Sequence, residues 1–242
     1  GGEDEEPTEN PNASKPRYIW IDAAANFPDF ANSKENIARD LALAKDAGFT
    51  DIVVDVRPTT GDVLFKTNLV DQVKFMYAWI GSNYTKVERT ATWDYLQAFV
   101  DEARKQGLRI HAAINTFVGG NQIDGGTGLL YRDQSKAEWA TQMNMQVGIT
   151  SVMNTSESTK FFNPAHPEVQ TFLCDLLKDL AGYDLDGIFL DRGRFLNLQA
   201  DFSEESRKQF EEYMGGIRIQ NYPNDILAPG ASSLPATYPK YL

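Results

Sequence analysis

Four polar residues stand at the ends of four short apolar runs, where they could carry out carboxylate chemistry. Asp22, Arg57, Asn115 and Asp191 each close such a run. A buried parallel strand is normally apolar throughout, so charge inside it needs a partner or a function. Carboxylates supply the acid, base or nucleophile of glycosidic cleavage. We therefore expect a sugar-binding site, with a structural Asp–Arg network as the alternative.

The same face of these runs carries further candidates. Trp20 and Asp55 are each two residues before a polar end residue, so their side chains are predicted to lie on the same face of the strand as that residue. The intervening positions are small or aliphatic. Aromatic side chains can stack on sugar rings, and aromatic residues are frequent near the ends of these runs. Glycosidic cleavage needs a second carboxyl group at about 5 to 10 Å from the first. Asp22 and Asp55 are both available for that role beside Asp191, and neither is marked by the sequence as the general acid.

The elements that must position these side chains alternate between short β-branched runs and amphipathic helical stretches. This rhythm predicts parallel βα units and an α/β fold, in which ligands bind at the C-terminal ends of the strands. The expected strands are 18–23, 51–57, 109–115 and 186–191, and the expected helices are 33–47, 93–106, 167–181 and 203–214.

Two connections, about 58–91 and 116–166, are too long to be simple turns, and insertions of this kind usually build or cover a site. The second is rich in glycine but matches neither GxGxxG nor the P-loop. We interpret its glycines as ordinary loop residues that permit turns. We expect no cofactor.

Composition narrows the classes of function. The net charge of −11 disfavours a nucleic-acid partner, which needs clustered positive charge. Two histidines make a histidine-rich metal site improbable, so no metal is predicted. Residues 1–16 are acidic and almost devoid of large apolar side chains. They are predicted to form a disordered tether ahead of a single domain at 17–242.

Five segments resemble the glycosyl-hydrolase-10-like family of β/α barrels, in the same order and context. The resemblance runs from about Tyr18 to about Gly216, and its fourth and fifth segments are the most specific. The segments are VVDVRPTTGDVLF (53–65), HAAIN (111–115), EWA (138–140), FNPAHPEV (162–169) and DGIFLDRGRF (186–195).

The resemblance assigns roles to individual residues. Asp191 lies where many related barrel hydrolases carry a catalytic carboxylate. Arg57 and Asn115 match positions that line the family's cleft, and Asn163 and His166 match the segment that enters the third helix. We expect these matched residues, together with polar and aromatic side chains on the same face and at the same ends of the strands, to bind substrate. His166 also has a purely structural interpretation as a helix-start residue, with equal weight. The substrate-binding set is Trp20, Asp22, Asp55, Arg57, Asn115, Asn163, His166, Arg192 and Arg194.

The resemblance further implies a TIM-barrel-type fold acting on a bacterial or dietary polysaccharide. Only about four strands are visible, so we expect a partial barrel, cut after its N-terminal half. Its open sheet edges favour self-association, and the half alone is a doubtful enzyme. The acidic tether resembles that of Bacteroides-type lipoproteins. This implies a lipid anchor upstream of Gly1 and a place in the envelope of a Gram-negative bacterium, periplasmic or at the outer-membrane surface.

Two other functions remain open at this point. The first is a noncatalytic surface protein that binds glycans through the same aromatic and polar rim. The second and weaker one is a metal-assisted β/α-barrel lyase or isomerase.

Overall fold

The computed structural model describes residues 15–234 of the 242-residue chain. The predicted tether at 1–16 therefore lies almost entirely outside the described residues. Among the described residues, no helix is both long enough and apolar enough to cross a bilayer.

A four-stranded parallel sheet organises the molecule. It contains β1 (Tyr18–Ile21), β2 (Asp51–Arg57), β5 (Arg109–Asn115) and β10 (Gly187–Asp191), in the order β1-β2-β5-β10. The four strands predicted from the sequence are confirmed, and β1 is two residues shorter than expected. Each strand pairs in parallel with its neighbour, so the C-terminal ends of all four lie at the same edge of the sheet. The fold is a partial β/α barrel.

The two faces of the sheet differ as the alternation predicts. Ile52, Val54 and Val56 on β2 belong to the main hydrophobic core, which is formed with the helices, whereas Val53 does not. The opposite face carries the polar side chains, and at the outer strands its aromatic residues reach solvent. Trp20 on β1 is 47% exposed, because the outer side of that strand has no further strand paired to it among the described residues.

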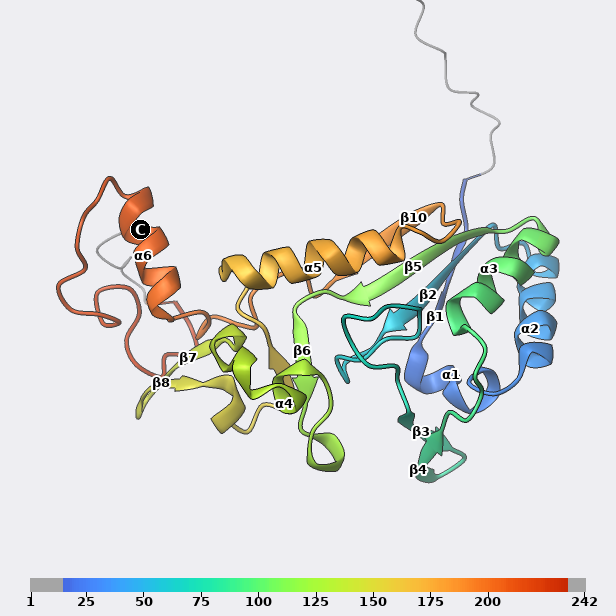
Figure 1. Cartoon of the computed structure of the whole chain (residues 1–242), viewed down its shortest axis with the longest axis horizontal. Coiled ribbons are helices and arrows are strands. Elements are labelled where there is room, and N and C mark those ends of the chain that lie inside the picture. The colour runs from blue at the N-terminus through green and yellow to red at the C-terminus, as the bar shows by residue number, and fades with distance from the viewer. Residues whose placement is uncertain (1–14, 235–242) are drawn as a thin grey trace, which may run out of the picture.

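The predicted helices form within two residues of their expected ends. α5 buries the stripe predicted for it, apart from Leu177, which is half-buried. Pro167 occupies its first turn, where the missing amide hydrogen is not needed. In Figure 1, α2 and α3 lie side by side at the right, α5 lies at the upper centre with β10 above its right end, and α6 lies at the far left. The helices are α2 (Lys34–Asp46), α3 (Tyr95–Gln106), α5 (Pro167–Leu180) and α6 (Glu204–Tyr213).

A short helix that the sequence analysis missed, α1 (Ala23–Phe30), follows β1 directly. The Asp22 carboxylate caps it by accepting a hydrogen bond from the Ala25 amide at 2.7 Å. The signal was weak, because the helix has only eight residues and contains Pro28. Its buried face, which includes Phe27 and Phe30, nonetheless joins the core.

The two long connections are folded as antiparallel hairpins and short helical turns. The first contains one hairpin, β3 with β4, and the second contains two further strand pairs, β6 with β9 and β7 with β8. These elements are β3 (Phe75–Ile80), β4 (Asn83–Glu88), β6 (Val118–Asn121), η1 (Ile123–Gly125), α4 (Leu129–Arg132), η2 (Gln134–Trp139), β7 (Gln142–Met145), β8 (Gly148–Ser151), η3 (Val152–Asn154) and β9 (Thr159–Phe161).

Candidate active site

A pocket of about 160 Å³ opens at the C-terminal edge of the parallel sheet. It brings together six of the residues predicted from the sequence and adds six further residues from the loops, from α1 and from β3 and β5. The predicted six are Trp20, Asp22, Asp55, Asn115, Asp191 and Arg192, and the additions are Ala24, Pro58, Thr59, Met76 and Ala113, with Ile114 completing the wall.

Asp55 is the buried carboxylate of this pocket. It lies on β2, is only 9% exposed, and accepts a hydrogen bond from the Arg57 amide at 3.1 Å. The pKa of Asp55 is raised to about 7, chiefly by burial and to a smaller extent by the negative charges of Asp22 and Asp191, against the lowering effects of that hydrogen bond and of the Arg192 charge. A carboxyl group with a pKa near neutrality can hold a proton and donate it, which is what a general acid requires.

Asp191 lies at the opposite side of the pocket, on the outer strand β10. It is exposed, and one carboxylate oxygen accepts a hydrogen bond from the Arg192 amide at 2.8 Å. The two carboxylates therefore have contrasting environments: Asp55 is desolvated, whereas Asp191 faces water. Contrasting environments are how one site separates an acid from a base or nucleophile.

Asp22 contributes a third carboxylate at the end of β1. One of its oxygens is engaged in capping α1, so its position is set by that helix. Its charge acts on Asp55 through space and raises the pKa of Asp55. We therefore treat Asp22 as a residue that tunes the site.

A hydrogen-bonded chain fixes the floor of the pocket. The Arg192 guanidinium donates to the Asn115 side-chain oxygen, and the Asn115 amide donates to the Arg57 carbonyl at 2.9 Å. Arg192 adopts a left-handed backbone conformation with φ of 46°. Such strain in a residue other than glycine tends to persist where surrounding contacts enforce it, often at functional sites.

Four predicted site residues lie outside the pocket. Arg57 is completely buried, and its guanidinium donates to the carbonyls of Asn115, Thr116 and Val118. The pairing of β2 with β5 shifts register between Asp55 and Arg57, and this irregularity changes the direction of the Arg57 side chain. Arg57 thus holds the loop after β5 in place, and burial lowers its pKa to about 10.

The other three belong to the loops around α5 and β10. Asn163 is buried and donates to the Ser203 hydroxyl at 3.0 Å. His166 caps α5 through Nδ1, which accepts a hydrogen bond from the Glu168 amide, so its structural interpretation is the one that the geometry supports. Arg194 donates to the carbonyls of Phe195 and Leu196 and does not line the pocket.

Sequence reasoning missed the contribution of β3 to the site. Met76, which lines the pocket, lies in a hairpin whose two-residue turn is Gly81-Ser82. A glycine in such a two-residue connection between alternating segments is a recognisable hairpin signal. Pro58, Thr59 and Met76 of the insertion at 58–91 line this pocket, which is where an insertion that builds the site is expected to lie.

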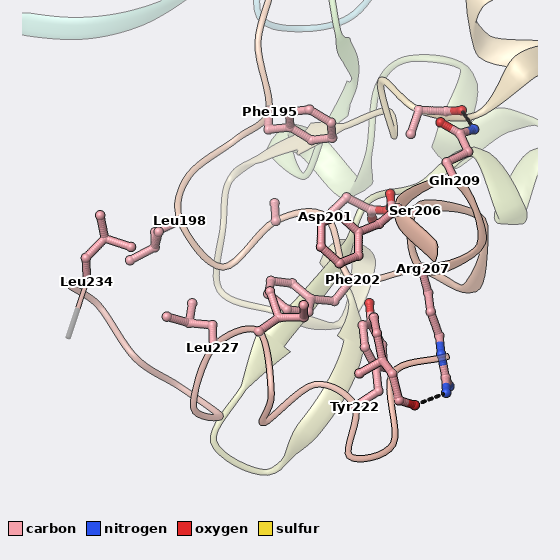
Figure 2. Close-up of a pocket in the computed structure, with 15 residues that line it drawn as sticks. Phe195, Leu198, Asp201, Phe202, Ser206, Arg207, Gln209, Tyr222, Leu227 and Leu234 are labelled. Carbon is pink, nitrogen blue, oxygen red and sulfur yellow. Dashed lines mark hydrogen bonds between the residues drawn. The ribbon is translucent and has the colours of Figure 1, made fainter. Parts of the chain in front are cut away.

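A larger cavity of about 390 Å³ is lined by Ala165 and by residues within 195–234, and it shares none of its lining residues with the carboxylate pocket (Figure 2). Its walls are mostly aromatic and aliphatic, and its polar groups hydrogen-bond within the protein. Arg207 donates to the Ile219 carbonyl at 3.0 Å, and Ser206 donates to Asp201 at 2.6 Å. None of the sequence-predicted site residues lines it, so the carboxylate pocket remains the candidate active site.

Comparison with known proteins decides the family. The model of a family described as glycosyl hydrolase-like 10 matches residues 15–224. The chain belongs to this glycosyl hydrolase-like family. The resemblance recognised in the sequence motifs is thereby confirmed.

The chain is similar to an S-layer-related protein of Niallia circulans, with 31% identity over 223 residues. The match covers 89% of this chain and 13% of that protein, so the chain spans about an eighth of its relative's length.

Two solved structures are similar to the chain, and the first of them supports the fold. Alpha-L-fucosidase isoenzyme 2 from Paenibacillus thiaminolyticus has a TM-score of 0.52 and 16% identity, over 83% of this chain and 26% of that one. A hypothetical protein from Ruminiclostridium thermocellum has a TM-score of 0.49 and 14% identity, over 82% of this chain and 88% of that one. The expected partial barrel of the TIM type is confirmed.

Proposed function

We propose that this chain carries the carboxylate half of a glycoside hydrolase site that acts on a bacterial or dietary polysaccharide. The observation that supports this most is the convergence of Asp55, whose pKa is about 7, with Asp191 and Asp22 in one pocket. Asp55 donates its proton to the oxygen of the glycosidic bond as that bond breaks. Asp191 serves as the second carboxylate, acting as base toward water or as nucleophile toward the sugar.

The test is the release of reducing ends from a panel of soluble polysaccharides by the full chain and its variants. Asp55→Asn and Asp191→Asn should each reduce cleavage about 100-fold or more. Asp175→Asn, a surface carboxylate on α5 whose side chain is 49% exposed, is the matched control and should leave the rate unchanged. Cleavage that persists in both site variants would contradict the assignment.

A noncatalytic glycan-binding protein is the second candidate. It is favoured by the exposed aromatic rings at the pocket rim, where Trp20 and Phe189 meet edge to face with centroids 5.3 Å apart. Binding of a polysaccharide without any cleavage by the wild-type chain would select this function over hydrolysis. Cleavage that depends on Asp55 and Asp191 would select hydrolysis.

We also propose self-association through the open sides of the sheet. The outer strands β1 and β10 expose Tyr18 by 49% and Leu190 by 54%, and unpaired strand edges favour pairing with another chain. Sedimentation velocity at several concentrations tests this. A stable, monodisperse monomer over the whole range would contradict it.

A cell-envelope location is proposed on two grounds: the S-layer-related relative and the acidic segment at residues 1–16. Fractionation of the source cells, followed by detergent partitioning of the natural protein, tests both the location and a lipid anchor. Recovery of the protein from the cytoplasmic fraction alone would contradict the envelope location.

A further inference from the structure

The β3–β4 hairpin carries a row of aromatic side chains on one face. Phe75, Tyr77 and Trp79 alternate along β3, and Tyr84 and Lys86 lie opposite Trp79 and Tyr77 on β4. Directly opposed residues of an antiparallel pair share a face, so these five side chains form one surface, which we name the hairpin face. Tyr84 stacks on Tyr77 with ring centroids 5.4 Å apart and contacts Trp79 at 5.1 Å.

The hairpin face is exposed although the hairpin itself is firmly attached. Trp79 is 68% exposed and Tyr84 is 56% exposed. The opposite face packs inward, with Met76 and Ala78 buried beside α1. The Asn32 side chain also donates to the Glu88 carbonyl at 2.9 Å, which ties β4 to the end of α1. An ordered aromatic surface that stays in water is a feature of binding sites.

The hairpin face continues from the candidate active site. Another cavity, of about 360 Å³ and distinct from the one in Figure 2, adjoins the carboxylate pocket. These two neighbouring hollows share Ala24, Thr59 and Met76. The second cavity is bounded on one side by the rings of the hairpin face and on the other by amide and hydroxyl groups. The residues that line it and not the carboxylate pocket are Thr60, Phe75, Tyr77, Tyr84, Asn121, Gln122, Ile123 and Ser158.

The charges on this surface balance each other. Lys86 forms an ion pair with Asp124 at 2.9 Å, and Tyr77 donates its hydroxyl hydrogen to the same carboxylate at 2.9 Å. The Lys86 ammonium group is therefore already paired and is not available to bind a polyanionic ligand. The chain as a whole carries a net charge of −11, which further disfavours an acidic polymer.

We propose that the hairpin face is a platform for an extended, neutral polysaccharide whose chain runs from the carboxylate pocket through the adjoining cavity to Trp79. This inference deepens the proposed function and rests on it for the identity of the ligand as a glycan. Pyranose rings stack on Tyr84 and Trp79, while the amides of Asn121 and Gln122 meet sugar hydroxyls. The substrate is then a long chain, because a monosaccharide or disaccharide cannot reach both ends of this surface.

Affinity electrophoresis of the full chain tests the platform. The gels contain barley β-glucan, xylan or galactomannan as neutral polymers, and polygalacturonate as an acidic one. Trp79→Ala and Tyr84→Ala should each weaken binding of a neutral polymer about tenfold. The matched control is Tyr213→Ala, which removes an aromatic residue on α6 that is 85% exposed and far along the chain from the hairpin. Thermal unfolding of each variant checks that the fold is intact.

The outcomes separate the platform from the proposed catalysis. Binding that is lost in Trp79→Ala and kept in Tyr213→Ala supports the platform, even if no polymer is cleaved. Cleavage by the wild type with equal polymer binding by Trp79→Ala overturns the platform and leaves the proposed hydrolysis standing. Three further results also overturn the platform. They are a preference for polygalacturonate, no binding to any of the neutral polymers, and a dimer of the wild type that dissociates in Trp79→Ala.

Discussion

Asp55 and Asp191 line the same pocket although β5 lies between their strands. Neighbouring strands lie about 4.8 Å apart, so the backbones of β2 and β10 are separated by about 10 Å. The two side chains converge at the C-terminal edge of the sheet, and the charge of Asp191 contributes to the raised pKa of Asp55. This electrostatic coupling can be measured directly.

The substitution Asp191→Asn should lower the pKa of Asp55 below its value of about 7. It removes a negative charge that disfavours ionisation of Asp55, while burial, the main cause, keeps that pKa above the ordinary range of aspartate. Titration of aspartate carboxyl carbons by NMR measures the change. Asp175→Asn serves as the control, and an Asp55 pKa that is the same in wild type and Asp191→Asn would rule out the coupling.

The substitution Asp55→Asn should change the pH dependence of folding. In the native state the pKa of Asp55 is about 7, whereas its ordinary value is 3.8, so between these values the native state binds more protons. The contribution of Asp55 to the free energy of unfolding of the wild type is therefore most favourable below pH 4, and it decreases as the pH rises toward 7. The asparagine side chain of the variant cannot ionise, so the variant should gain up to about 4 kcal/mol relative to wild type between pH 4 and pH 8.

Urea unfolding at several pH values between 4 and 8 measures this difference in the free energy of unfolding. Asp175→Asn removes a surface carboxylate and should show no comparable trend. A constant stability difference between Asp55→Asn and wild type across this range would show that Asp55 has an ordinary pKa in the folded protein.

Replacing Arg57 should destabilise the fold, because its guanidinium serves three backbone carbonyls in a completely buried position. Arg57→Met should lower the free energy of unfolding by about 3 kcal/mol or more, since those carbonyls lose their donors. Arg57→Lys keeps the charge but lacks the planar fork, and it should rescue only part of the loss.

The control for this series is Arg39→Met, at a side chain that is 55% exposed and pairs with the partly exposed Asp40 and Asn36. Its effect should stay within about 0.5 kcal/mol. Chemical denaturation measures all three variants, and an Arg57→Met protein as stable as wild type would refute the structural role of Arg57.

Two glycines in the connection after β6 provide a matched pair. Gly125 and Gly128 both have positive φ, of 81° and 85°. A Cβ atom at Gly128 would lie 2.5 Å from the Gly120 Cα and 2.7 Å from the Gly119 oxygen, whereas at Gly125 it would meet nothing within 4 Å. Gly125→Ala should cost about 1 to 2 kcal/mol from backbone strain alone. Gly128→Ala should cost clearly more, because backbone atoms must also move.

Thermal or chemical unfolding of both alanine variants measures the difference. Equal destabilisation of Gly125→Ala and Gly128→Ala would mean that the close approach of Gly128 to the β6 backbone is not tight. The comparison is informative because the two substitutions share the same unfavourable φ.

Much of the scaffold was predictable from local patterns. The strands and the longer helices follow from alternation, from the 3.6-residue periodicity of α5 and from the glycine that ends α3 at Gly107. The short helix α1 and the β3–β4 hairpin were missed. Their formation depends on packing against each other, with Phe27 and Met76 buried, and single-element periodicity does not contain that contact.

The sequence by itself determined that polar side chains end four parallel strands, and hence that three of them, Asp22, Asn115 and Asp191, meet at one edge. This follows because strand direction and a period of two fix which side chains share a face and an edge. Only the tertiary structure decided their environments. The register shift in β2 accompanies the turn of the Arg57 side chain away from the pocket into the protein, and burial distinguishes Asp55 from the exposed Asp191. Register shifts and desolvation arise from contacts between distant segments, so the order of residues along the chain does not reveal them.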